Sequence, residues 1–124
     1  MPALRLLDFE RSDDGEGHLT LDAMASVRPE QLAALHAEVT RVLAWAHAEF
    51  PDGPAPLDDG ASWDLDLQAS TERSARARLR YDPLTDRLGA ESAGGETVRH
   101  TVTLSIAATE AFGAAFAAAF PAAD

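Results

Sequence analysis

The chain of 124 residues contains no cysteine, no lysine and no asparagine, and its ten basic residues are all arginine. The absence of cysteine excludes disulfides, thiolate catalysis and zinc sites of the cysteine type. No apolar run approaches the roughly 20 residues of a membrane span. Residues 1–5 lack the apolar stretch of a signal peptide. The sequence therefore predicts a cytoplasmic protein that does not enter a membrane.

Positive charge is scarce in this chain. Ten arginines stand against 21 acidic residues, which gives a net charge of −11. Phosphate backbones repel so acidic a chain, so we expect no nucleic-acid partner. The absence of lysine and asparagine, the single isoleucine and the many alanines indicate a GC-rich bacterial genome. The arginines are therefore weak evidence for phosphate recognition, although arginine suits it well.

Aromatic residues make up only 6% of the chain, but 46% of it is hydrophobic, which excludes a wholly disordered protein. A chain of this length buries about two thirds of its unfolded surface and folds without disulfides or metals. We expect one globular domain over residues 1–124, with the last few residues frayed.

Hydropathy patterns predict a β-hairpin followed by a long helix. The apolar run at residues 4–9 is predicted as a strand and the Asp- and Gly-rich residues 11–17 as a turn. Residues 19–27 alternate between apolar and polar side chains, as a half-buried strand does. Residues 29–50 begin with proline and an acidic first turn and place their apolar side chains on one helical stripe.

A second hairpin is predicted from two alternating segments, residues 63–69 and 75–81. Pairing them around a turn at residues 70–74 places acidic residues opposite arginines, with Asp66 directly opposite Arg78. The same register places apolar side chains opposite one another, and a shift of one residue would destroy both matches.

The remaining segments complete the predicted fold. Residues 87–91 are expected to form a short return strand and residues 98–106 a long final strand. Thr109 can cap a closing helix that ends before Pro121. The order ββα-βββ(β)-α predicts a two-layer α+β domain with an antiparallel five- or six-stranded sheet and both helices on one face.

Metal and cofactor motifs fail on decisive residues. His36 and His47 are eleven residues apart on the predicted helix, about 16 Å of rise, too far for one metal ion. A calcium loop beginning at Glu10 places Leu21 where a bidentate glutamate is needed. Residues 15–17 contain two glycines but lack the third glycine of a dinucleotide-binding loop. We expect no metal and no cofactor.

Catalytic residues are equally hard to find. Residues 60–64 resemble a G-x-S-x-G nucleophile motif except at the last position, and they precede a strand. His100 has the strand parity of the apolar face, so it is a candidate general base, alone or with His36. A structural histidine at the edge of the core explains the same pattern. The sequence favours a protein that is not an enzyme.

Polar side chains are predicted to share the sheet face opposite the helices, either as a solvated face with paired charges or as an interaction surface. Trp45 lies on the flank of the long helix, where it either contacts a partner or packs at the edge of the core. The candidate interaction residues are Asp64, Asp66, Arg76, Arg78, Arg80, Arg99, Thr101, Thr103 and Trp45.

The charge of −11 and the polar face favour a protein-binding accessory module, and a basic protein is the partner that the charge suits. The nearest alternative is a homodimer formed through the sheet face or an exposed edge strand. A small acid–base enzyme using His100 or His36 with a carboxylate is the third hypothesis.

Overall fold

A four-stranded antiparallel sheet, two helices and a projecting two-stranded ribbon make up the computed structural model, which describes residues 4–121. The predicted fraying concerns residues outside that range. In chain order the elements are β1 (Glu10–Asp13), β2 (His18–Val27), the 3-10 turn η1 (Pro29–Gln31), α1 (Leu32–Glu49), the 3-10 turn η2 (Leu57–Asp59), β3 (Trp63–Ser74), β4 (Ala77–Asp82), β5 (Arg87–Ser92), β6 (Thr97–Thr109) and α2 (Glu110–Ala119).

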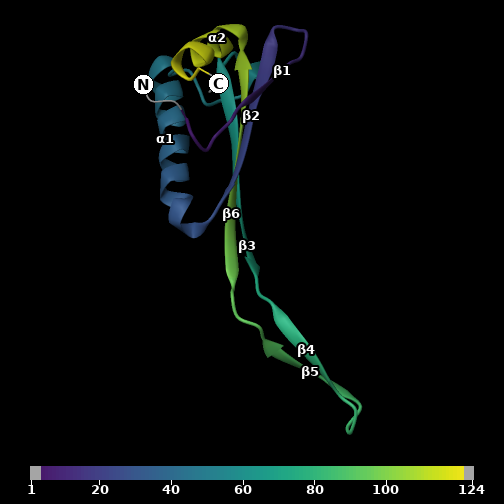
Figure 1. Cartoon of the computed structure of the whole chain (residues 1–124). Helices are drawn as coiled ribbons and strands as arrows, with labels where there is room; N and C mark the ends of the chain where they lie inside the picture. Colours follow the sequence, from purple (N-terminus) through teal and green to yellow (C-terminus); the bar gives the residue numbers. More distant parts are fainter. Residues whose placement is uncertain (1–3, 122–124) are drawn as a thin grey trace.

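The strands form two sheets instead of the single five- or six-stranded sheet that was predicted. Four strands pair antiparallel in the order β1-β2-β6-β3, and β4 pairs only with β5. Two residues connect β3 to β4, whereas residues 93–96 connect β5 to β6 and include two glycines with positive φ. These unequal connections interrupt the ladder, so β4 and β5 leave the sheet as a separate ribbon (Figure 1).

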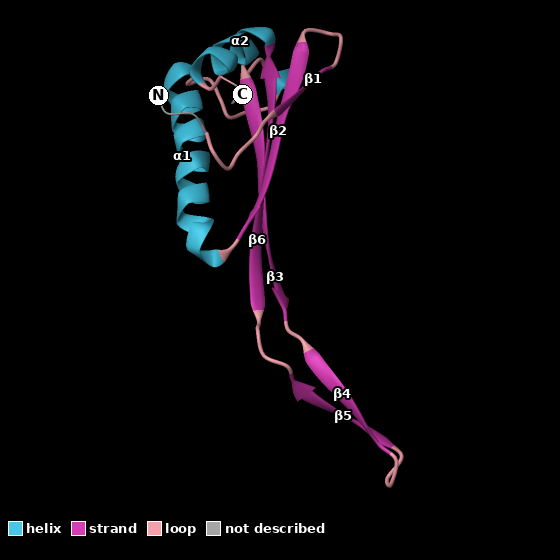
Figure 2. Ribbon diagram, viewed as in Figure 1, coloured by secondary structure: helices cyan, strands magenta, loops and turns pink. Residues whose placement is uncertain are grey.

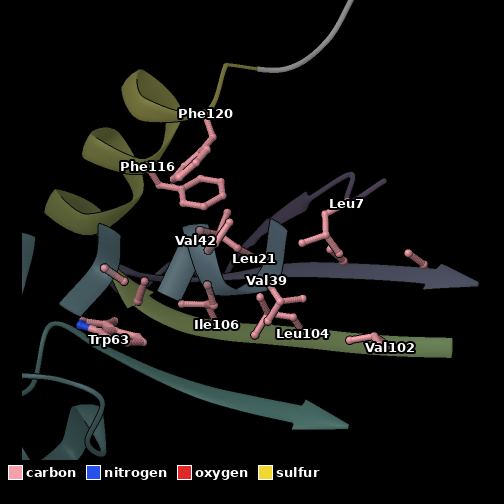
Figure 3. Close-up of a cluster of buried hydrophobic side chains, with 14 of the residues drawn as sticks. Leu7, Leu21, Val39, Val42, Trp63, Val102, Leu104, Ile106, Phe116 and Phe120 are labelled. Atoms are coloured by element: carbon pink, nitrogen blue, oxygen red, sulfur yellow. The ribbon is translucent and has the colours of Figure 1, made fainter. Parts of the chain in front are cut away.

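The core lies between one sheet face and the two helices. Alternate residues of β2 and β6 are buried and lie opposite one another, as Leu21 does with Ile106 and Ala23 with Leu104. Figure 3 shows these side chains packed against α1 and the phenylalanines of α2. Because both helices belong to one buried cluster with the same strand residues, both cover the same face of the sheet, as predicted.

Both predicted helices are present. The 3-10 turn η1 and then α1 occupy the segment that begins at Pro29, and the buried residues Leu35, Val39 and Val42 follow the predicted stripe. The Thr109 hydroxyl accepts a hydrogen bond from the Phe112 amide, so Thr109 caps α2. This bond satisfies one of the amides that a helix leaves free at its start.

The predicted strand at residues 4–9 is wrong, and β1 instead spans Glu10–Asp13, most of it inside the turn predicted at residues 11–17. The reason is a buried carboxylate on α1. Glu38 accepts hydrogen bonds from the backbone amides of Arg5, Leu6 and Leu7 at 3.0–3.2 Å. Because these amides donate hydrogen bonds to the carboxylate, they are not available to pair with a neighbouring strand.

The predicted register of the second hairpin is also wrong. Asp66 lies opposite Ser105 of β6, and Arg78 lies opposite Glu91 of β5. Residues 70–74 continue β3 instead of turning, and the chain reverses at residues 83–86. A pattern of period two matches any antiparallel partner with the same alternation, so it does not by itself select one.

Candidate functional site

The projecting ribbon is the region that the rest of the protein does not cover. We define the arm as residues 76–93, which comprise β4, β5, the turn between them and the hydrogen bond from the Ala93 amide to the Arg76 carbonyl at the base. Figure 2 shows the arm extending beyond the sheet and both helices. Every residue of β4 and β5 is exposed.

One face of the arm is apolar. Leu79 lies opposite Ala90, and Tyr81 lies opposite Leu88, so these four side chains share a face. The exposed fractions are 66% for Leu79, 57% for Tyr81 and 69% for Leu88. Leu84 in the turn is 94% exposed. Among the described residues, four of the six large exposed hydrophobic side chains therefore lie in the arm.

The other face of the arm is charged. Arg78 lies opposite Glu91 and Asp82 opposite Arg87. The Arg80 guanidinium lies 3.4 Å from the Glu91 carboxylate in an exposed ion pair. Such pairs contribute little stability but keep the charged face solvated. The arm is therefore amphipathic, with opposite charges neutralising one another on its charged face.

The arm also differs from the rest of the chain in net charge. Residues 76–93 contain four arginines and three acidic residues, a net charge of +1. The rest of the chain, residues 1–75 and 94–124, which we call the body, contains six arginines and eighteen acidic residues, a net charge of −12. The acidity of the protein thus resides outside the arm.

A hydrogen bond orders the tip of the arm. The Tyr81 hydroxyl donates to the Asp86 carboxylate at 2.7 Å, and this bond raises the pKa of Tyr81 above its usual value. Asp86 has a φ of 56°, a left-handed conformation that tight turns need and that aspartate tolerates. The bond joins β4 to the turn and holds the tyrosine ring on the apolar face.

The predicted polar face exists opposite the helices, with fewer of the predicted residues than expected. The residues of β6 on this face alternate with the buried residues of that strand, and the residues of β3 lie opposite them. Five of the predicted residues therefore share the face with Asp22 and Met24 of β2: Asp64, Asp66, Arg99, Thr101 and Thr103. The Ser105 hydroxyl donates to Asp22 at 2.6 Å, and the Thr101 hydroxyl donates to Ser26 at 3.1 Å. The hydroxyls on this face thus bond largely to neighbouring strands.

The other predicted interaction residues lie elsewhere. Arg76, Arg78 and Arg80 belong to the arm, so the prediction that they share the sheet face is wrong. Trp45 is partly buried and makes edge contacts with four phenylalanine rings, which places it at the edge of the core.

The candidate histidines do not come together. His100 is partly buried on the helix-covered face, as its parity predicts, and its Nδ1 lies 3.0 Å from the Thr71 hydroxyl. His36 is exposed on α1. In residues 4–121, a hydroxyl rather than a carboxylate is the side-chain partner of His100.

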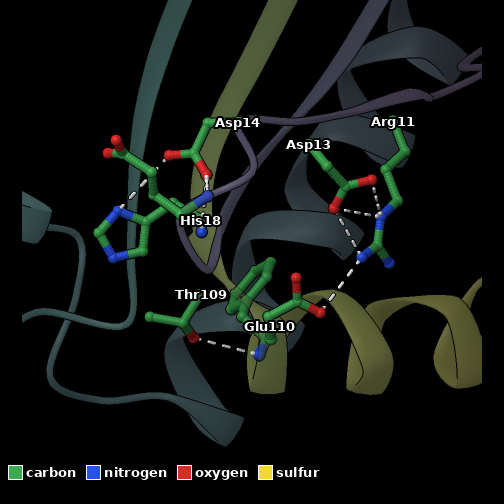
Figure 4. Close-up of polar contacts among 8 residues, drawn as sticks. Arg11, Asp13, Asp14, His18, Thr109 and Glu110 are labelled. Atoms are coloured by element: carbon green, nitrogen blue, oxygen red, sulfur yellow. Dashed lines mark hydrogen bonds and ion pairs between the residues drawn. The ribbon is translucent and has the colours of Figure 1, made fainter.

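Two polar networks support the end of the molecule opposite the arm (Figure 4). Arg11 pairs with Asp13 at 3.0 Å and with Glu110 at 3.4 Å, which connects β1 to α2 and raises the pKa of Arg11. Asp14 accepts hydrogen bonds from the amides of Glu16 and His18, which lower the pKa of Asp14. These exposed contacts shape the turn before β2.

Glu38 is the residue that the sequence analysis missed. It is only 6% exposed and lies among the apolar residues of α1 that face the core. A carboxylate on an apolar stripe was the available signal, because buried acids need partners. Its amide partners identify it as a structural clamp for the N-terminal segment.

A groove of about 360 Å³ lies between the N-terminal segment and α2 and is lined by apolar side chains such as Leu7, Phe9 and Phe116, with Arg5 and Arg11 among its polar residues.

Within residues 4–121, no group of three or more potential metal ligands is found. The same described range contains no helix with the length and apolarity to cross a membrane.

Comparison with known proteins gives no match, whether with family models, with curated proteins or with solved structures.

Proposed function

We propose that the chain is a protein-interaction module and that the arm is its binding element. The observation that carries this proposal is the exposed apolar face formed by Leu79, Tyr81 and Leu88 on a ribbon whose two strands, among the described residues, pair only with each other. Clustered apolar side chains of this kind are typical of interaction surfaces. The accessory role, the bacterial cytoplasm and the basic partner stay predictions from the sequence.

The physical argument is the marginal stability of an isolated two-stranded ribbon. Covering apolar surface stabilises it by about 25 cal/mol per Å², and β4 and β5 are exposed on both faces. Tyrosine adds an apolar ring with a polar end, a combination enriched at protein interfaces. A partner on the apolar face would therefore stabilise the arm and bind at the same time.

The acid–base alternative has less support. Such an enzyme needs a histidine within hydrogen-bond reach of a carboxylate, whereas His100 lies beside the Thr71 hydroxyl and His36 is exposed. The polar sheet face is a second candidate surface, but the Thr101 and Ser105 hydroxyls on it already donate to residues of the neighbouring strand β2.

Affinity capture tests the proposal. Wild-type protein, the double variant Leu79→Asp/Leu88→Asp and the control Met24→Asp are immobilised and exposed to an extract of the source cells and to the purified chain, at low and high salt. Met24 is the matched control because it is 69% exposed but lies on the sheet.

We expect wild type and Met24→Asp to retain a protein at both salt concentrations, because apolar contacts are not screened. The double variant should not capture this protein. Equal capture by all three proteins that disappears at high salt would mean that charge on the acidic body binds the partner, and the proposal would be wrong.

A further inference from the structure

We infer that the apolar face of the arm binds the same face of a second copy of this chain, with the two arms antiparallel about a two-fold axis. This inference rests on the proposed function, since it names the partner of the same surface. Two-fold contacts require a self-complementary patch, and a flat face of aliphatic and aromatic side chains meets that requirement.

Charge distribution is the first argument for a second copy. Two bodies with a net charge of −12 each repel one another wherever they approach closely, whereas the arms carry +1 each. Each six-residue strand of the arm spans about 20 Å, more than two Debye lengths of about 8 Å at physiological salt. Contact through the arms therefore joins two copies while their acidic bodies stay largely screened from one another.

The order of charges along the arm is the second argument. The base of the arm contains Arg76, Arg78 and Glu91, a net charge of +1, whereas Asp82, Asp86 and Arg87 give the tip a net charge of −1. An antiparallel arrangement places the tip of one arm near the base of the other, so ends of opposite net charge come close together. Charges of this kind set orientation more than affinity.

A basic partner is less consistent with the arm. The body, with its net charge of −12, attracts positive charge far more strongly than the arm does. The arm presents leucine and tyrosine beside a face that already pairs its own charges. The surface therefore suits an apolar face of near-zero charge, which a second arm provides.

The size of the face sets the expected affinity. A ribbon of two six-residue strands is about 20 Å long and 10 Å wide. Two such faces form an interface at the low end of the range for specific complexes. We therefore expect a reversible dimer with a dissociation constant in the micromolar range.

Sedimentation over a wide concentration range tests this inference with wild type, Leu79→Asp/Leu88→Asp and Met24→Asp. We expect wild type and Met24→Asp to pass from monomer to dimer as concentration rises, and the double variant to stay monomeric. Circular dichroism should show the same thermal transition in all three, because the arm lies outside the core.

Disulfide trapping gives an independent measurement, because the chain has no cysteine of its own. Ala90→Cys places one thiol on the apolar face near the centre of the arm, and Met24→Cys places one on the sheet. Mild oxidation should link Ala90→Cys into dimers and leave Met24→Cys monomeric.

The outcomes separate the inference from the proposed function. A wild-type chain that stays monomeric and untrapped overturns the second copy as partner, while arm-dependent capture of a different protein would still support the interaction module. A dimer that persists in Leu79→Asp/Leu88→Asp overturns both, because the contact would then lie away from the arm.

Discussion

The body and the arm of this protein are built from the same kind of alternating strand, yet only one of them is covered. In the body, β2 and β6 alternate between polar residues and residues buried under the helices. In the arm, β4 and β5 alternate just as regularly, but both faces are exposed. Alternation therefore gives a strand one apolar face, but it does not say whether the rest of the chain covers that face.

The length of α1 explains where the helices stop covering the sheet. The 18 residues of α1 span about 27 Å, whereas the 12 residues of β3 span about 40 Å. Burial along β3 accordingly falls from the buried Trp63 through the half-buried Asp64 and Leu65 to exposed residues from Asp66 onward. The strand β3 is longer than α1, and the arm begins just after β3 ends.

The largest expected difference between the two regions is how much the free energy of unfolding falls when an apolar side chain is removed. Trp63 is fully buried, stacks on Phe112 and donates its indole N–H to the Phe50 carbonyl at 2.9 Å. Trp63→Ala should lower the free energy of unfolding by about 4 kcal/mol. In the arm, Leu79→Ala should change it by less than about 0.5 kcal/mol. Urea denaturation measures both, at concentrations where the protein is monomeric. Similar costs would mean that the arm is part of the cooperative core.

The next effect concerns the clamp on α1. Glu38→Ala leaves three backbone amides without their carboxylate, so we expect a loss of about 3 kcal/mol. Hydrogen exchange should accelerate first at the amides of Leu6 and Leu7. Glu49→Ala, an exposed position on the same helix, is the matched control and should change stability by less than about 0.5 kcal/mol. An equal effect of the two substitutions would contradict the clamp.

A smaller effect is expected where α2 packs on β2. A Cβ added at Gly113 would lie 2.5 Å from Cδ2 of Leu19, which is itself buried. Gly113→Ala should therefore destabilise the body by about 1 kcal/mol despite the better helix propensity of alanine. Thermal denaturation measures the change. At the arm glycine Gly89 an added Cβ would lie 4.0 Å from the Arg80 carbonyl oxygen, an ordinary contact distance, so Gly89→Ala should leave stability nearly unchanged.

The smallest effect is confined to the tip of the arm. Tyr81 is the one tyrosine of the chain, so its ultraviolet titration can be followed directly. Because the hydrogen bond to Asp86 favours the neutral phenol, the midpoint should lie above 10, and Asp86→Ala should move it down towards that value. The bond contributes to the order of the arm below pH 10 and is lost as pH rises through the raised pKa. An unchanged midpoint in Asp86→Ala would contradict the bond.

Several elements could be predicted because local signals specify them. Proline at the start of the 3-10 turn that leads into α1, a threonine cap on α2 and strict alternation in β2 and β6 each act over a few residues. The shared polar face of Asp64, Asp66 and Arg99 follows from alternation once the sheet order is known. Arg76, Arg78 and Arg80 were predicted wrongly to share this face, because β3 pairs with β6, far along the chain, and not with β4.

The sequence by itself determined which segments form helices, which faces of β2 and β6 are apolar and how acidic the protein is, because these follow from side chains and their local spacing. The tertiary structure decided strand pairing, the use of the Arg5–Leu7 amides by Glu38 and the exposure of the arm. Each of these depends on which distant segments fill the limited space under one face of the sheet. The apolar residues of β6 are buried under the helices, whereas those of β4 stay exposed because the helices end before they reach it.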